Sequence, residues 1–196
     1  MSDFRYSDNL VLQAALEATY GIEQTTFAAS DCILLTEEPT FETVWINEDR
    51  DLVNPYFGVS EQLPATSYVK MKFKTEIVGS GVAGTPPPIG KLLIGCGMVE
   101  TIFAGNRVEY TPGAPQISAG LSFRFNNDGV RYGTKGGRGK VKLDLTAYKR
   151  PIADFEFWSF DKKETAIAMP TVDYTAFKLP EAVSYTHLTL PTNREV

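Results

Sequence analysis

The sequence predicts a mainly β protein: an antiparallel β-sandwich or barrel with one short helix. Residues 68–78 provide the first observation, because apolar residues alternate there with charged ones: Val69, Met71, Phe73, Thr75 and Ile77 against Lys70, Lys72, Lys74 and Glu76. A helix would scatter those lysines around its circumference, whereas a strand puts them on one face. The second observation is a hairpin signal, Asn126-Asn127-Asp128-Gly129, between two further alternating runs.

The first half of the chain contains further strand signals. Residues 8–20 are compatible with a short helix, capped by Ser7 or Asp8 and stopped by Gly21, or with an extended arm. Residues 32–37 and 41–46 are apolar runs, and we expect a strand from each. A long loop follows at 47–65, and loops of that length in a compact domain are usually functional or reach a partner.

In the second half, three prolines at 86–88 lead into a helix that we expect over residues 91–98. Strands are predicted from the alternation at 117–125 and from the returning run at 130–134. A second turn is predicted at Gly136-Gly137-Arg138-Gly139. Two more strands follow, at 141–145 and at 155–160, the latter covered in part on both faces.

Composition limits the function classes. With 196 residues, 43% of them hydrophobic, the chain can bury a core without disulfides or metals. We expect Cys32 and Cys96 to be buried free thiols, with a disulfide between them left open. The formal charge of −5 argues against a dedicated nucleic-acid binder. There is no apolar run of membrane-spanning length and no signal peptide at the N-terminus, so no membrane partner is expected.

The sequence contains few of the residue patterns that catalysis needs. We therefore predict no enzyme, no cofactor and no metal site. The pattern Gly79-Ser80-Gly81-Val82-Ala83-Gly84 matches a dinucleotide-binding motif but leads into prolines, where that motif needs a helix. The single histidine, His187, gives histidine-dependent catalysis no partner. Carboxylates surround Trp45 at Glu42, Glu48, Asp49 and Asp51, so a sugar-binding β-sandwich module stays open as an alternative.

The last residues, 183–196, differ in origin from the rest of the chain in our interpretation. Residues 183–192 resemble the translation of a sequencing-library adaptor, and we expect 183–196 to be non-native read-through. A genuine C-terminal strand remains the alternative. The domain prediction is therefore one β-sandwich domain over residues 1–182, with the natural chain continuing further.

Short motifs follow one another in order between residues 16 and 174: Leu16-Glu17-Ala18-Thr19-Tyr20-Gly21, Asn54-Pro55-Tyr56-Phe57-Gly58, Glu76-Ile77-Val78-Gly79-Ser80-Gly81, Pro86-Pro87-Pro88-Ile89-Gly90-Lys91-Leu92-Leu93, Cys96-Gly97, Val108-Glu109-Tyr110-Thr111-Pro112, Asn127-Asp128-Gly129, Gly136-Gly137-Arg138-Gly139 and Pro170-Thr171-Val172-Asp173-Tyr174. In their order and spacing the chain resembles the tail-tube (major tail) proteins of long-tailed bacteriophages. No single motif is diagnostic.

The resemblance implies a structural virion protein that closes with its own copies into rings, of six subunits, and stacks them into the conduit for phage DNA. Its partners would be itself, the tape measure, the tail terminator, the baseplate and passing DNA bound without sequence specificity. It would reside in the virion tail and, during assembly, in the host bacterial cytoplasm. Another phage structural protein, such as a tail terminator or a capsid-decorating protein, is the main alternative.

The candidate subunit-interface residues are apolar groups on the N-terminal segment and in the 47–65 loop: Leu10, Leu12, Leu16, Leu52, Tyr56 and Phe57. A lone domain has no evident means of covering them, and exposed apolar patches usually mark an interaction surface.

Deleting residues 183–196 is expected to leave the melting temperature unchanged within error, because nothing selected those residues to pack. Thermal unfolding followed by circular dichroism is the measurement. A fall of several degrees would show that the segment belongs to the fold.

Overall fold

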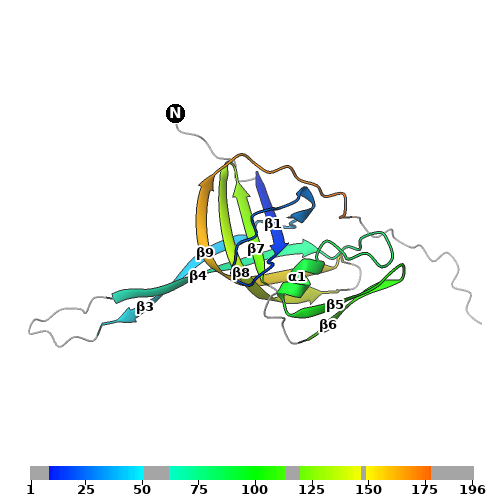
Figure 1. Cartoon of the computed structure of the whole chain (residues 1–196), viewed down its shortest axis with the longest axis horizontal. Helices are drawn as coiled ribbons and strands as arrows, with labels where there is room; N and C mark the ends of the chain where they lie inside the picture. Colours follow the sequence, from blue (N-terminus) through cyan, green and yellow to red (C-terminus); the bar gives the residue numbers. More distant parts are fainter. Residues whose placement is uncertain (1–8, 51–61, 114–119, 147–148, 178–196) are drawn as a thin grey trace, which may run out of the picture.

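The computed structural model of the chain describes residues 9–50, 62–113, 120–146 and 149–177 (Figure 1). Antiparallel strands dominate these residues, together with a 3-10 turn and a short α-helix, so the predicted fold class is confirmed. The elements, in chain order, are β1 (Leu10–Leu16), η1 (Ala29–Asp31), β2 (Cys32–Ile33), β3 (Thr40–Asp49), β4 (Gln62–Glu76), α1 (Gly90–Gly95), β5 (Met98–Phe103), β6 (Arg107–Pro112), β7 (Leu121–Asn127), β8 (Val130–Asp144) and β9 (Ile152–Ala166).

One sheet contains seven of the strands, in the order β2-β1-β7-β8-β9-β4-β3, and β5 and β6 form a separate hairpin. The long strands β8 and β9 each belong to two parts of the sheet. Residues 130–137 of β8 pair with β7, whereas residues 152–159 of β9 pair with β4. We call β3, β4, residues 138–144 of β8 and residues 152–159 of β9 the arm half. In Figure 1, β3 and β4 run across the picture while β7 and β1 stand upright.

The two parts meet at a bend in β8. Its pairing with β9 shifts register between Gly133 and Lys135 and again between Lys135 and Arg138, and Gly136 has a φ of 64°. A Cβ at Gly139 would clash with the backbone oxygen of Glu156. The turn predicted at residues 136–139 is therefore wrong: the glycines form a bulged, tightly packed stretch inside one 15-residue strand.

The bend curls the sheet so that its concave face becomes the core. Phe123 on β7 and Phe157 on β9 have ring centroids 4.9 Å apart, and Phe73 on β4 lies 6.2 Å from Phe123. At the edge of the sheet, Phe41 of β3 stacks on Phe125 of β7 at 5.6 Å, although three strands separate β3 from β7 in the sheet order. The open sheet is thus sandwich-like, with its own two parts as the layers.

The segment after β2 connects one end of the sheet order to β4. Leu35 forms an antiparallel bridge with Thr75, and the Thr36 amide donates to the carbonyl oxygen of Lys74 at 3.0 Å. The Thr75 hydroxyl donates to the carbonyl oxygen of Leu34 at 2.7 Å. These bonds hold the curled sheet from the side opposite the bend.

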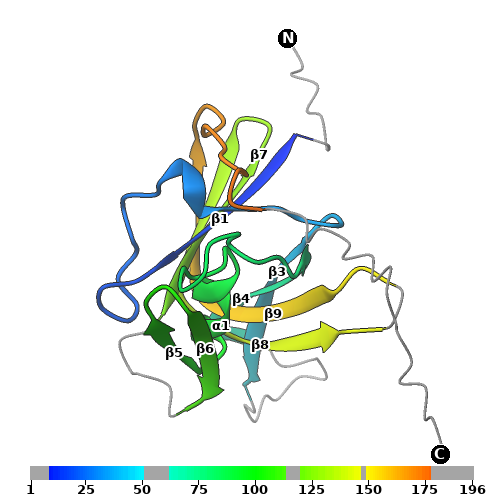
Figure 2. The same cartoon turned by 90° about the vertical axis from the view of Figure 1, so that its right-hand side faces the viewer.

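The helix α1 covers the remaining part of the core, with Leu92 and Leu93 buried. A Cβ at Gly95 would meet the side chains of Leu121 and Phe157, so the helix packs directly on the sheet. Figure 2 shows the β5–β6 hairpin beside α1. The helix predicted over 91–98 is confirmed, one residue earlier at its start and three residues shorter at its end.

Most of the expected pattern of β4 is confirmed. Val69, Met71 and Phe73 are buried, and the alternate lysines lie on the opposite face, partly or fully exposed. Ile77 follows the strand and is partly buried. The predicted hairpin turn is confirmed at Asp128 and Gly129, whose φ values of 37° and 87° fit the turn that Asn, Asp and Gly favour.

Other expectations need correction. Residues 10–16 form neither a helix nor an arm but β1, a strand paired on both sides with β2 and β7. The two hydrogen-bonded ladders outweigh the weak helical propensity of a short segment. The predicted 47–65 loop is shorter, because β3 extends to Asp49 and β4 starts at Gln62; residues 51–61 lie outside the described residues, as do 183–196. Cys32 is buried and Cys96 partly buried, and both are free thiols.

Gly139→Ala is expected to lower the free energy of unfolding by about 1–3 kcal/mol, because the added methyl group meets backbone across the ladder. Chemical denaturation measures the change. The matched control is Gly79→Ala, where a Cβ would meet only the Gly81 nitrogen at 3.9 Å. Equal stabilities of the two variants would contradict the role given to the bend.

Candidate assembly surface

A two-stranded ribbon projects from the sheet (Figure 1). We call it the arm; it comprises residues 44–49 of β3 and 62–68 of β4. Residues 45–49 and 62–66 are all exposed. Three of them are large apolar side chains, Trp45, Ile46 and Leu63, with 63%, 47% and 49% of their surface exposed.

The arm has little to support it within the described residues. The pairing of β4 with β9 ends at Val69 and Ser159, so only β3 accompanies β4 beyond that point. The Gln62 amide donates to the Asp49 carboxylate at 2.7 Å across the ribbon. An isolated two-stranded ribbon is marginally stable in water, and exposed apolar groups on it favour contact with another chain.

The two outer strands of the arm half carry opposite charges. β3 contains Glu42, Glu48 and Asp49 and no basic residue. Residues 138–144 of β8 contain three bases, Arg138, Lys140 and Lys142, and one acid, Asp144. Among the described residues, no strand pairs with the outer edge of β3 or with the edge of β8 over residues 138–144. Free edges of this kind can pair with another chain.

The outer face of the arm half holds an ion network centred on Glu156. Its carboxylate lies 2.8 Å from the Lys140 ammonium and 2.9 Å from the Lys70 ammonium, with Lys72 at 3.8 Å. The hydrogen bonds from Lys140 and Lys70 lower the pKa of Glu156 from 4.5 to about 2. The network therefore adds ion pairs across β8, β9 and β4 to the backbone pairing of these strands.

A pocket lies in the fork where β4 and β9 separate. Its volume is about 300 Å³, and its lining is rich in aromatic rings: Tyr20, Tyr68, Trp158 and Phe160, with Gly136, Arg138, Gly139 and Ser159. We call it the fork pocket. The Arg138 guanidinium lies 4.2 Å from the centre of the Tyr20 ring, and Tyr20 meets Phe160 edge-on at 6.2 Å. An aromatic pocket with one cation suits an apolar or amphipathic group.

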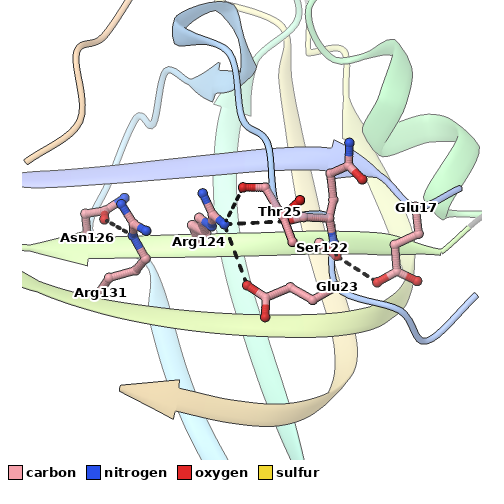
Figure 3. A network of polar contacts seen from close by, with 8 residues as sticks. Glu17, Glu23, Thr25, Ser122, Arg124, Asn126 and Arg131 are labelled. Atoms are coloured by element: carbon pink, nitrogen blue, oxygen red, sulfur yellow. Dashed lines mark hydrogen bonds and ion pairs between the residues drawn. The ribbon is translucent and has the colours of Figure 1, made fainter. Parts of the chain in front are cut away.

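Polar contacts hold the segment that carries Tyr20 (Figure 3). The Glu17 carboxylate accepts hydrogen bonds from the Ser122 hydroxyl at 2.8 Å, the Gly136 amide at 2.6 Å and the Gly21 amide at 2.7 Å. Arg124 donates to the Thr25 carbonyl oxygen at 3.0 Å further along the same segment. The wall of the fork pocket at Tyr20 is thus fixed to β7 and to the bend of β8.

The predicted interface residues differ in how far the structure buries them. Leu12 is 1% exposed and belongs to the core, so the reason for assigning it to an interface, that a lone domain cannot cover it, is wrong. Leu10 packs against the core and is partly buried, whereas Leu16 is 38% exposed. Leu52, Tyr56 and Phe57 lie outside the described residues, and their role in subunit contacts stays a prediction.

Sequence reasoning missed the charged edges and the fork pocket. The acidic strand and the basic strand were each visible as compositions, but only the sheet order places them at opposite sides of the arm half. The pocket collects residues from four separate parts of the chain, and no local pattern connects them.

The described residues offer little further chemistry. Among the described residues, no group of three His, Cys, Asp or Glu side chains could hold a metal ion. None of the helices in the described ranges is long and apolar enough to cross a membrane. Burial raises the pKa of the Cys96 thiol to about 12, which keeps it protonated and unreactive.

The chain was compared with protein-family models, curated proteins and solved structures. No protein-family model and no curated protein matches the chain. A chain of the sheath–tube complex of an extracellular contractile injection system (PVC), solved by cryo-EM in the extended state, aligns with a TM-score of 0.43 and 8% identity, covering 85% of this chain and 95% of that chain. A TM-score below 0.5 at this identity does not establish a common fold.

The ion network predicts a pH dependence. Because the folded-state pKa of Glu156 is depressed, its ion pairs stabilise the folded chain above pH 4.5 and are lost as the pH falls to about 2. The melting temperature of wild type should exceed that of Glu156→Gln at neutral pH, and the gap should close between these two pH values. Glu38→Gln, at an exposed position, controls for the loss of one negative charge. A gap that stays constant down to pH 2 would contradict the network.

Proposed function

We propose that this chain is a structural subunit of a phage tail tube. Copies of the chain bind one another through two different edges and form rings, and the rings stack into a conduit for DNA. The observation that supports this best is the pair of free edges of the arm half, one acidic on β3 and one basic on β8. The motif order of the sequence supports the choice of a tail tube among ring-forming proteins.

The direction of the strands supports head-to-tail pairing. β8, β9, β4 and β3 are antiparallel in that order, so β3 runs opposite to β8. When β8 of a second copy lies beside β3, the antiparallel alternation continues without interruption. Two different surfaces then meet at every contact, and such heterologous contacts generate a ring where the rotation closes.

The side chains support the same pairing. In the strand register, Glu42 lies opposite Lys70 and Lys140 lies opposite Glu156. These positions are on the outer face of the arm half. Glu42 of one copy and Lys140 of the next therefore lie on the same face of the continued sheet. Opposite charges on neighbouring strands stabilise the pair, whereas like charges there are unfavourable.

Other assignments remain as alternatives. A tail terminator or a capsid-decorating protein would use self-contacts in single rings or in clusters without forming long tubes. A sugar-binding module would use an aromatic surface and would need no self-assembly. A tail tube differs from both, because it requires contacts between copies within a ring and also contacts between stacked rings.

Charge reversal tests the edge pairing. Glu42→Lys and Lys140→Glu should each abolish rings and tubes in negative-stain electron microscopy, because each brings like charges together across the contact. The double variant should restore assembly in part, because it recovers the charge pair across the contact but not the Lys140–Glu156 pair within the chain. Arg107→Glu, at an exposed position of the separate β5–β6 hairpin, is the control and should assemble like wild type.

Circular dichroism must report a folded β protein for every variant. Wild-type chain that stays monomeric under all conditions, and with tail-initiating partners present, would contradict the proposed function. Assembly that ignores both single reversals would contradict the edge pairing.

A further inference from the structure

The fork pocket is an aromatic site with no described segment of the chain to fill it, and the arm is an apolar ribbon with little to cover it. We propose that the fork pocket receives the arm of a second copy of this chain. This inference rests on the proposed function and adds to it the site that each arm enters.

The first argument is the chemistry of the two surfaces. The arm presents Trp45, Ile46 and Leu63 with about half or more of each side chain exposed. The fork pocket presents four aromatic rings, of which Phe160 is 49% exposed. Each surface alone exposes apolar area to water, and their contact removes both areas from water together.

The second argument is the path of the paired edges. In an antiparallel contact that places Glu42 of one copy opposite Lys140 of the next, Val44 lies opposite Arg138. The free edge of β8 ends there, because residues 130–137 pair with β7 of their own chain. Arg138 and the nearby Gly136 both line the fork pocket. The edge pairing therefore brings the start of the arm to the rim of the pocket, where β3 leaves the β8 edge.

The third argument is charge. The tip of β3 beyond Ile46 carries Glu48 and Asp49. The pocket side carries the Arg138 guanidinium, and the Lys140 ammonium lies 5.3 Å from the centre of the Trp158 ring. An acidic, apolar ribbon thus meets a cationic, aromatic site, which favours the arm of this chain over a basic or neutral partner.

The pocket is also shaped before the arm arrives. Tyr20 is fixed by its contacts with Arg138 and Phe160, and its segment is anchored through Glu17 to Ser122. A preformed site loses little conformational entropy when it is filled. This is the behaviour expected of a receptor surface that must accept one neighbour in one orientation.

Crosslinking between two singly substituted chains tests the inference. An Ile46→Cys chain and a Phe160→Cys chain are mixed, allowed to assemble, and treated with a short bis-maleimide. Both positions are exposed, and circular dichroism of each chain checks that loss of the Phe160–Tyr20 contact leaves the fold intact. The native thiols stay silent because Cys32 is buried and the Cys96 thiol has a pKa of about 12.

A covalent dimer that forms only in the mixture supports the arm-to-pocket contact. The matched control mixes Ile46→Cys with Ile102→Cys, which is equally exposed but lies on β5, and it should give no dimer. Each substituted chain alone should also give none.

The possible results distinguish the arm-to-pocket contact from the proposed function. Rings or tubes without the Ile46–Phe160 dimer would overturn the arm-to-pocket contact and leave the proposed function standing, with another occupant for the pocket. Chains that neither assemble nor crosslink would overturn both.

Discussion

The packing of Phe123 against Phe157 is the interaction on which the rest of the structure depends. These rings belong to strands that are separated by β8 in the sheet, and they meet at 4.9 Å only because β8 bends between them. The bend is possible because Gly136 adopts a positive φ and because Gly139 leaves room for the backbone of Glu156. A single sheet can then supply both layers of a core, and α1 needs only to close the remaining side.

The same bend creates the surfaces to which we assign function. Since β9 follows β8 into the curl, it leaves β4 after Ser159, and β4 continues with β3 alone as the arm. The fork pocket forms at that separation, and residues 138–144 of β8 are left without a described neighbour on one side. The requirements of the core and the proposed means of assembly therefore have a common origin in one glycine-rich stretch.

The sequence predicted those features that depend on residues close together in the chain. The alternation around Phe73 and the turn at Asp128 and Gly129 are such cases, because a period of two and a positive φ each have a short-range signature. The β class and the short helix followed from the same kind of signal.

Features that depend on distant partners were missed. Glycines at 136–139 have the composition of a turn, and only their packing against Phe123 and Phe157 shows them to be a bulge within a strand. Leu12 was taken for an interface residue because its partners on β2 and β7 are far away in the sequence. The fork pocket, built around Tyr20 and Trp158, has no sequence signal at all.

Hydrogen–deuterium exchange of assembled against monomeric chain tests the central claim most directly, because it reports on backbone amides at the two edges. Head-to-tail pairing predicts that exchange slows on assembly in β3 and in residues 138–144 of β8 together, while the interior strands β1 and β7 change little. Assembled chain in which both edges exchange as fast as in the monomer would contradict the account.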